Sequence, residues 1–350
     1  MFSEPIIGGR TIDTNSEPFI IAEISANHHG SLEMALKTIS EAKICGADAV
    51  KMQSYTADTL TIDSNKEDFL IKSGLWMGRS LYDLYSEACT PFEWHKTIFE
   101  HARREGIILF STPFDESAVD LLESLKAPAY KIASFEIVDL PLIARVAKTK
   151  KPLLISTGMA SLDEIGDALQ VAHSNGCKQL AILHCISSYP TLIDEANLKS
   201  ITLLKKEFGV EVGLSDHTIG YIAGMLAVSL GASFIEKHFI LDRGLGGVDS
   251  EFSAEPSELI ELIEKTKLAY CAIGTNEFKR SSTEKANQVF RRSIYYTASL
   301  NSGDEVKDEH IRIIRPGFGL EPKYYNKVVG KRVNKNVEPG DRVSFTDFDD

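Results

Sequence analysis

The sequence predicts an α/β fold, a (β/α)8 TIM barrel followed by a small, mostly β C-terminal domain. Short apolar runs alternate with longer segments of helical spacing, and most runs are continuously apolar, as strands buried on both faces of a parallel sheet are. Eight such units within about 260 residues are what a barrel requires. An open doubly wound sheet is the competing fold, because spacing alone does not show closure. The expected strands are PFIIAEISA (18–26), DAVKMQSY (48–55), IILFSTPF (107–114), AYKIAS (129–134), PLLISTG (152–158), LAILHCIS (180–187), EVGLSDH (211–217) and FIEKHF (234–239).

The segments between these runs carry helix signals. SLEMALKTISEAKICG begins at Ser31, a good N-cap residue, and ends at Gly46, which suits a helix C-terminus. An insertion at 56–104, after the second strand, is expected to form a long loop with helical content, and such loops at the mouth of a barrel often shape a substrate pocket. Acidic starts and apolar periodicity predict further helices in DESAVDLLESL (115–125), SLDEIGDALQVAHSNG (161–176) and EPSELIELIEKTKLAYCAIG (255–274).

Three parts are expected along the chain. The barrel domain is predicted to cover 1–275, a polar linker 276–289, and a separate small domain 290–350. Turns containing NSGD and EPGD join short strand-like segments in this last domain. These segments are RSIYYTASL (292–300), EHIRIIRPG (309–317), VVGKRV (328–333) and DRVSF (341–345).

Composition narrows the class of protein. The chain has 350 residues, 43% of them hydrophobic and 25% charged, which is typical of a globular protein. A net charge of −12 argues against nucleic acid or a membrane as the main partner. Five scattered cysteines without a CxxC spacing suggest reduced thiols. The N-terminus shows no signal peptide, and no run reaches the ~18 apolar residues of a membrane helix, so a soluble cytoplasmic protein is expected.

Polar side chains gather where the predicted strands end. In a barrel these ends form the active site, together with the loops that follow. Any single residue could be a surface group or a satisfied core group, but their presence at nearly every strand predicts a site. The residues are Glu23, Asn27, Lys51, Gln53, Thr112, Lys131, Ser134, Glu136, Ser156, Ser187, Tyr189, Ser215, His217, Glu236 and His238.

Part of this set favours anion binding. Lys51 and Lys131 follow apolar stretches and would supply positive charge inside the mouth. The hydroxyl groups of Thr112, Ser134, Ser156 and Ser215 would add directional hydrogen bonds. A small phosphorylated acid fits such a pocket.

Two histidines favour a metal. His217 and His238 end neighbouring strands, so their imidazoles should lie close together. Two neutral nitrogens with open remaining positions suit Mn²⁺, Mg²⁺ or Co²⁺ that also binds substrate oxygens and water. Two unrelated core histidines are the alternative. From strand alternation we expect the nearby Asp216 and Glu236 to point away from this site.

Several segments resemble the sialic acid synthase family, which condenses phosphoenolpyruvate with an acylamino sugar aldehyde to give a nine-carbon 2-keto acid. The similarity runs from about residue 18 to the C-terminus, where the tail resembles the family's antifreeze-like (SAF) domain. SANH and YDLYSEACTPFEWH are most similar to the pseudaminic acid synthase branch, which uses 2,4-diacetamido-2,4,6-trideoxy-L-altrose and supplies flagellin glycosylation. The other matching segments are AEISANHHGSLEMAL, GADAVKMQSY, STPFD, YKIASFE, ISTGMAS, GLSDHTIG, EKHFILDR, RRSIYY and RPGFGL.

The resemblance implies a role for many of these residues. His217 and His238 would hold Mn²⁺ or a similar ion. Lys131, Thr112, Ser134 and Ser156 would bind the phosphate of phosphoenolpyruvate, and Lys51 and Ser215 its carboxylate. Gln53, Tyr189 and Asp249 resemble contacts to the acceptor sugar. Arg315 resembles an arginine that reaches the site from a partner subunit, which implies a domain-swapped homodimer. Ser187 stands where many relatives carry Asn.

The NHHG segment at 27–30 lies near the same mouth. Asn27 and His28 are expected to hold substrate groups or to orient Glu23, and His29, where relatives carry Asn, is expected to be a helix-entry residue.

In the implied reaction, C3 of phosphoenolpyruvate attacks the sugar aldehyde and leaves an oxocarbenium ion at C2. Glu23 or Glu136 would stabilise this ion or steer the water that attacks it, and phosphate would then leave by C–O cleavage. A Schiff base on Lys51 or Lys131 is the rival mechanism. The alternatives in function are an N-acetylneuraminate or legionaminic acid synthase, a synthase of seven- or eight-carbon keto acids, and a non-catalytic sugar- or ice-binding module.

Overall fold

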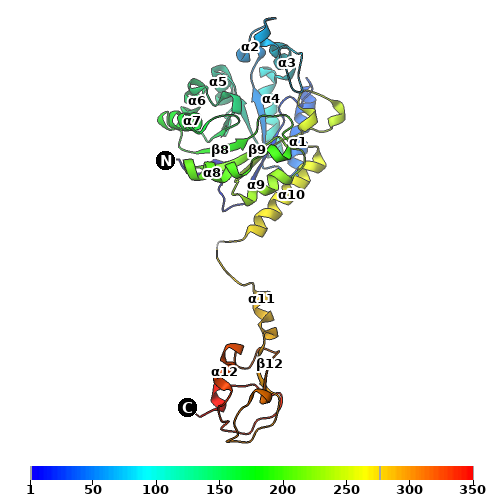
Figure 1. Ribbon diagram of the computed structural model, residues 1–350. Helices are drawn as coiled ribbons and strands as arrows, with labels where there is room; N and C mark the ends of the chain where they lie inside the picture. The colour runs from blue at the N-terminus through cyan, green and yellow to red at the C-terminus, as the bar shows by residue number, and fades with distance from the viewer. Residues whose placement is uncertain (1, 276, 350) are drawn as a thin grey trace. The chain divides into compact units, whose positions relative to one another are not determined.

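The computed structural model describes residues 2–275 and 277–349 (Figure 1). The chain divides into two compact units, Met1–Gly274 and Thr275–Asp350. Residues 1, 276 and 350, where three of the predicted domain limits fall, lie outside the described part.

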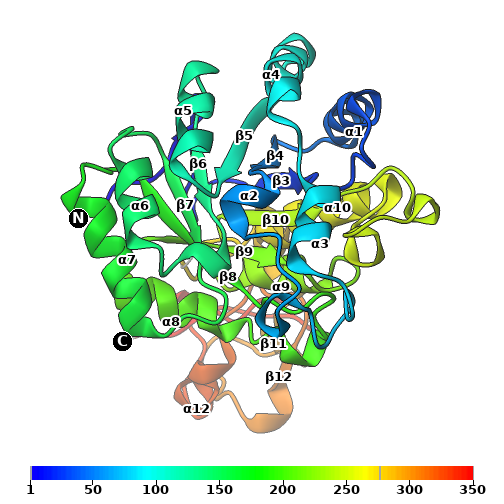
Figure 2. The same cartoon turned by 90° about the horizontal axis from the view of Figure 1, so that it is seen from above.

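The first unit contains a closed barrel of eight parallel strands, as predicted (Figure 2). The ring closes because the last strand pairs with the first, with His238 opposite Glu23 in the ladder. An open doubly wound sheet is therefore wrong. In their order around the ring, the strands are β10 (Phe234–His238), β3 (Phe19–Glu23), β4 (Ala49–Ser54), β5 (Ile108–Pro113), β6 (Tyr130–Ile132), β7 (Leu153–Ser156), β8 (Leu180–Cys185) and β9 (Glu211–Asp216).

A helix follows each strand and packs outside the ring (Figure 2). The Ser31 side chain caps the first of these helices by accepting a hydrogen bond from the Met34 N–H, and Gly46 ends it at φ 95°. Both ends agree with the predicted cap residues. The outer helices are α1 (Leu32–Cys45), α4 (Phe92–Glu105), α5 (Glu116–Ser124), α6 (Leu140–Ala147), α7 (Leu162–Ser174), α8 (Lys199–Phe208), α9 (Ile222–Ser229) and α10 (Pro256–Ile273).

Strand alternation creates two apolar layers. One set of side chains, including Ile21, Ala49 and Phe234, fills the interior of the ring. The alternate set, including Ile20 and Ile235, packs against the helices. Side chains two residues further along the inward rows therefore reach the C-terminal mouth of the barrel.

The insertion after β4 contains two short helices, α2 (Ala57–Leu60) and α3 (Leu81–Ala88), before the barrel helix α4. This agrees with the predicted helical content. Sequence patterns did not predict the small N-terminal hairpin of β1 (Ile6–Ile7) and β2 (Arg10–Thr11). Its buried Ile7 joins the inner apolar layer.

The second unit has its own small core. β11 (Ser293–Tyr296) pairs antiparallel with β12 (Ile311–Ile314). The other two predicted strands, 328–333 and 341–345, are not regular strands: each joins a neighbour only through isolated bridges, and Val328 is instead buried at the end of the short helix α12 (Tyr325–Val328). The remaining helix is α11 (Ser282–Ala286). Within the described ranges, no helix is long and apolar enough to span a bilayer.

Candidate active site

Four buried charges of alternating sign meet in the mouth of the barrel. Lys51 Nζ lies 2.5 Å from Glu23 Oε2 and 3.6 Å from Glu236 Oε1. Lys131 Nζ donates to both oxygens of Glu236, at 3.0 and 3.1 Å. All four side chains are at most 5% exposed. Such buried charges are stable only when paired, so each ammonium is neutralised by a carboxylate before any ligand enters.

The position of Glu236 corrects one prediction. We expected it to point away from the histidine site, but His238 is two residues further along the same strand, and residues i and i+2 share a face. Glu236 therefore points inward and also accepts a hydrogen bond from Ser215 Oγ, at 3.0 Å. The expectation is correct for Asp216, which is adjacent to His217 and lies on the opposite face. Correct use of the same alternation rule could have found Glu236.

The two carboxylates of this cluster differ in acidity. Burial raises the pKa of Glu23 to about 7, although Lys51 opposes this. Burial also acts on Glu236, but Lys131 and Lys51 outweigh it and lower its pKa to about 2. Two neighbouring carboxyl groups with separated pKa values suit different roles, one able to exchange a proton near neutral pH and one always charged.

The pKa values of the two lysines are also shifted in opposite directions. Burial lowers the pKa of Lys131 despite its contacts with Glu236. For Lys51 the two carboxylates outweigh burial, and the pKa is raised. Lys51 Nζ also donates to Thr112 Oγ1 at 3.2 Å. Lys51 is thus shared between two carboxylates and a hydroxyl group of the mouth.

A cradle of small hydroxyl groups lies at the end of β7 and in the segments that follow β6 and β8. Ser134 Oγ and Ser187 Oγ are 2.8 Å apart, and Ser156 Oγ is buried without a hydrogen-bond partner among the described residues. Gly158 has φ +50°, and a Cβ there would lie 2.5 Å from Ser134 Cβ and 2.8 Å from Ser187 Oγ. The cradle exists because Gly158 has no side chain. We call Ser134, Ser156, Gly158 and Ser187 the hydroxyl cradle.

Glu136 supplies a second carboxyl group with a raised pKa. It follows β6 in the short 3₁₀ turn Ser134–Glu136, and its Oε2 is buried with no described hydrogen-bond partner. Burial raises its pKa to about 7. Both predicted acid–base residues can therefore take up or release a proton near neutral pH.

The two predicted metal ligands lie side by side at the ends of β9 and β10. The ring centroids of His217 and His238 are 5.4 Å apart. His217 Nδ1 lies 2.8 Å from the Ile186 carbonyl oxygen. Because a carbonyl only accepts, Nδ1 carries the proton. Burial acts to lower the pKa of His217, but the ring also contacts the Cys185 thiol, and burial does not outweigh this contact, which raises the pKa of His217. Burial holds the pKa of His238 well below its usual value, so this ring is neutral, and its Nδ1 is buried without a partner in the described chain.

These histidines fit a divalent ion for which the protein supplies only part of the coordination shell. Asp249 Oδ2 lies 3.9 Å from His238 Nδ1. Within residues 2–275 and 277–349, no three His, Cys, Asp or Glu side chains are arranged to hold an ion by themselves. The protein offers two imidazole nitrogens, so the remaining coordination positions would fall to substrate and water, as in an open catalytic site.

Aromatic rings surround the histidines. Tyr189, after β8, lies 4.4 Å from His217 between ring centroids, and Phe252 lies 4.8 Å from His238. Trp76, from the insertion after β4, packs 5.8 Å from Tyr189 and donates its indole N–H to the Val248 carbonyl at 2.9 Å. The insertion thus reaches the loop that carries Asp249. We expected this insertion to shape the pocket, but the sequence did not single out Trp76.

The remaining predicted residues have varied surroundings. Gln53, on β4, is half-buried and lies opposite Thr112 of β5 in the ladder. The Asn27 amide donates to Phe239 O and Ser253 Oγ, and its Oδ1 is buried without a described partner. Arg315 is exposed in the second unit.

The adjacent histidines of the NHHG segment are not paired as metal ligands. His28 is buried against Trp94 and accepts a hydrogen bond from the Gly30 N–H. His29 has φ 50° and lies against Gly247, where a Cβ would come within 2.9 Å of its ring. His29 thus packs under the loop that leads to Asp249.

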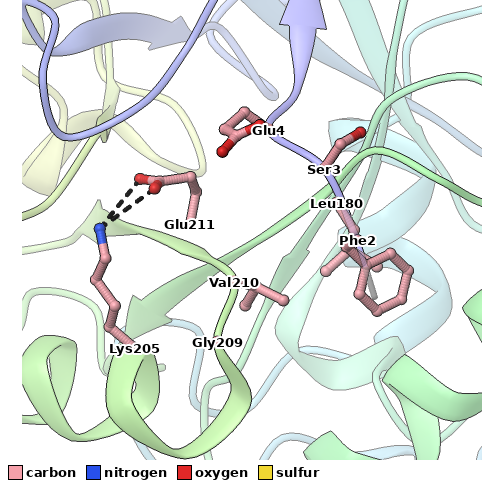
Figure 3. Close-up of a pocket in the computed structure, with 8 residues that line it drawn as sticks. All are labelled: Phe2, Ser3, Glu4, Leu180, Lys205, Gly209, Val210 and Glu211. Atoms are coloured by element: carbon pink, nitrogen blue, oxygen red, sulfur yellow. Dashed lines mark hydrogen bonds and ion pairs between the residues drawn. The ribbon is translucent and has the colours of Figure 1, made fainter.

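A hollow of about 190 Å³ lies at the other end of the barrel (Figure 3). It is lined by Leu180 and Glu211, the first residues of β8 and β9, and by Phe2 and Lys205. The candidate site at the strand C-termini does not include it. In TIM barrels the N-terminal end serves stability rather than chemistry.

Comparisons with known proteins show the family of this chain. A model of the NeuB family matches residues 38–278, and a model of the SAF domain matches 291–349. The chain is 46% identical to the pseudaminic acid synthase of Campylobacter jejuni (strain 81-176) over 96% of this chain and 98% of that protein. It is 40% identical to the pseudaminic acid synthase of Helicobacter pylori over 95% of this chain and 98% of that protein. A crystal structure of N-acetylneuraminic acid synthetase from Leptospira borgpetersenii, in complex with citrate, has a TM-score of 0.74 and 33% identity over 82% of this chain and 95% of that one.

Proposed function

The chain belongs to the NeuB family and is a transferase-type enzyme, and from this premise we propose that it is a pseudaminic acid synthase. In this proposal it condenses phosphoenolpyruvate with 2,4-diacetamido-2,4,6-trideoxy-L-altrose, and the products are a nine-carbon 2-keto sugar acid and phosphate. The observation that carries the proposal is the joining of a lysine pair, a hydroxyl cradle and a histidine pair in one barrel mouth. The 46% identity to a pseudaminic acid synthase over nearly the whole chain supports this acceptor.

Phosphoenolpyruvate carries a phosphate and a carboxylate, which need separate cationic partners. The hydroxyl cradle and Lys131 suit the phosphate, because Ser156 Oγ is an unused donor and the Ser134–Ser187 pair can turn toward an anion. Lys51 and Ser215 suit the carboxylate, and Thr112 is assigned to the phosphate, as the family resemblance implies. Glu236 holds both lysines until the ligand arrives, so little reorganisation is needed on binding.

The acceptor sugar would lie on the histidine side of the mouth. Tyr189, Asp249 and Gln53 are the proposed contacts, and Trp76 closes this side from the insertion. His217 and His238 would hold a divalent ion, Mn²⁺ in the first instance, which supplies Lewis acidity toward the aldehyde oxygen. The contribution of these residues is to fix two nitrogens at one point while leaving space for substrate.

The chain's own groups can perform the remaining steps. Holding C3 of phosphoenolpyruvate against the aldehyde supplies rate by orientation. Charge that develops at C2 would be stabilised by Glu23, whose Oε2 faces the lysines, or by Glu136. Either carboxyl group can take a proton from the water that adds at C2, because each titrates near pH 7. Phosphate then leaves with the bridging oxygen, with Lys131 beside it.

The direct test measures phosphate release from phosphoenolpyruvate with Mn²⁺ and a panel of acceptors. The panel contains the diacetamido altrose and the sugars that would be extended to N-acetylneuraminate or N,N′-diacetyllegionaminate. We expect the highest kcat/KM with the altrose. A higher value with another sugar would assign the enzyme to a different branch, and no release with any of them would support a binding protein instead.

An isotope experiment tests the bond that breaks. With ¹⁸O at the bridging position of phosphoenolpyruvate, we expect the label in phosphate. Label retained in the sugar acid would mean P–O cleavage and would exclude the proposed attack of water at C2. His217→Ala and His238→Ala should each lose Mn²⁺ binding while keeping the barrel fold.

A further inference from the structure

A buried ion pair lies outside the barrel mouth, on the strands that carry the histidines. Lys237 Nζ lies 2.8 Å from Asp216 Oδ2, and both side chains are at most 2% exposed. The two residues face each other in the ladder between β9 and β10. By alternation they belong to the outward rows, which otherwise pack apolar side chains such as Leu214 and Ile235 against the helices. No step proposed above uses this pair.

A charged pair in this layer calls for an explanation. Burying two charges costs several kcal/mol of desolvation, and well-packed apolar residues are often as stable or more so. Neighbouring positions of the same layer show that apolar residues are accommodated there. A role in the stability of the barrel is therefore a poor account of the pair, and a role in geometry is a better one.

The pair contacts the residues on both sides of His217. Asp216 precedes it, and Asp216 Oδ1 accepts hydrogen bonds from both Thr218 N, at 2.9 Å, and Thr218 Oγ1, at 2.8 Å. Lys237 Nζ also donates to the Thr218 carbonyl oxygen. The residues before and after His217 are thus tied to one another and to the neighbouring strand.

The same contacts fix His238. Lys237 precedes it directly, so the bond from Lys237 to Asp216 joins the two peptide segments that end in the two imidazoles. His217 is further held by the bond from Nδ1 to Ile186 O and by the Cys185 thiol, whereas His238 Nδ1 is buried without a described hydrogen-bond partner. Backbone hydrogen bonds hold His238 to β3 and to Ala254, and the bond from Lys237 to Asp216 adds a side-chain tie between the segments that carry the two imidazoles.

We propose that Asp216 and Lys237 form a positioning pair, which holds the ends of β9 and β10 so that His217 and His238 converge on one divalent ion. The inference rests on the proposed function, because it takes these histidines as the ligands. Outer contacts of this kind typically change metal affinity by about 10- to 100-fold.

The test compares metal binding with folding. The double variant Asp216→Asn/Lys237→Met removes both charges and keeps an oxygen acceptor for Thr218 and an apolar chain of similar length. Mn²⁺ is titrated into metal-free protein, and free Mn²⁺ is followed by electron paramagnetic resonance. We expect an unfolding temperature near that of the wild type without metal, and a Kd for Mn²⁺ weakened by about 10- to 100-fold. Affinity for phosphoenolpyruvate without metal should not change.

A matched control lies at the other end of the same strand. Lys205 Nζ pairs with Glu211 at 3.3 Å, far along β9 from His217. Lys205→Met/Glu211→Gln should leave Mn²⁺ binding as in the wild type. Asp216→Asn alone, which keeps the oxygen acceptor for Thr218 and the bond from Lys237 to the Thr218 carbonyl oxygen, is the second variant if the double variant does not fold, and it should weaken Mn²⁺ binding in the same direction.

The outcomes separate this inference from the proposed function. If the wild type binds Mn²⁺ and the folded variants bind it equally well, the positioning role is refuted while the proposed function stands. If the wild type binds no divalent ion, the ligand role of His217 and His238 falls, and this inference falls with it.

Discussion

Gly158 provides the sharpest test of the phosphate position. An alanine there would place a Cβ 2.5 Å from Ser134 Cβ and 2.8 Å from Ser187 Oγ, closer than real Cβ contacts come, so the two hydroxyl groups must move. Crowding in a packed region costs roughly 1–3 kcal/mol. The φ of +50° adds about 1–2 kcal/mol of backbone strain.

The expected loss concerns one ligand. A hydrogen bond to a charged group contributes about 1.5–3 kcal/mol, so losing one from the cradle should weaken phosphoenolpyruvate binding between about 10- and 150-fold. The assay is the Kd of phosphoenolpyruvate by titration calorimetry, with the KM of each substrate and the unfolding temperature measured in parallel. The KM of the acceptor sugar should change less, because the nearest atoms to a Cβ at Gly158 belong to Ser134 and Ser187 and not to the proposed acceptor contacts Gln53, Tyr189 and Asp249.

Gly106→Ala is the matched control. Gly106 ends α4 at φ +68°, and nothing lies within 4 Å of a Cβ built there. It should lose stability through backbone strain alone and bind phosphoenolpyruvate normally. Unchanged binding in Gly158→Ala, or an equal loss in Gly106→Ala, would refute the idea that this cradle receives the phosphate.

Three further predictions follow from the site. Glu236→Gln leaves Lys131 without its carboxylate, so we expect a destabilisation of about 3–5 kcal/mol that added phosphoenolpyruvate partly reverses in a thermal unfolding assay; an unchanged unfolding temperature would contradict the charge cluster. Folded Glu136 keeps its proton up to about pH 7 and the unfolded carboxyl group loses it near 4.5, so stability should fall as pH rises through this window, and the fall should be smaller in Glu136→Gln when unfolding is measured across pH. Trp76→Phe loses the hydrogen bond to Val248 O, so steady-state kinetics should show a raised KM for the acceptor sugar and an unchanged KM for phosphoenolpyruvate; the opposite pattern would place the acceptor elsewhere.

Local sequence patterns predict the barrel well because parallel strands are buried on both faces. The eight apolar runs all became strands, and Ser31 and Gly46 became helix caps. The second unit was harder to predict, because its core is held by isolated bridges and short helices. There Val328 and Val333 are buried without forming a strand, so an apolar run no longer identifies one.

The sequence predicts which residues form the site but not which of their charged side chains contact one another. Strand ends alone place Lys51, Lys131, His217 and His238 at one mouth. Alternation places Glu236 in the mouth, but which carboxylate meets which lysine depends on how strands far apart in the sequence are arranged, so the contacts of Glu236 with both lysines emerged only in three dimensions. Trp76 lies in an irregular segment, and no periodicity specifies where such a segment folds back.

The pairing of the first barrel strand with the last also determines at which stage of folding the site forms. Glu23 and His238 are ladder partners, so a chain that has not yet incorporated β10 has Glu23 and Lys51 but lacks both Glu236 and the second imidazole. Contacts between such distant segments form late, because a long loop must first be closed. A ligand of this site therefore binds only the completed ring and stabilises it by mass action. If the chain is split into two fragments or circularly permuted, a rise in stability on adding phosphoenolpyruvate would therefore show that the barrel has closed.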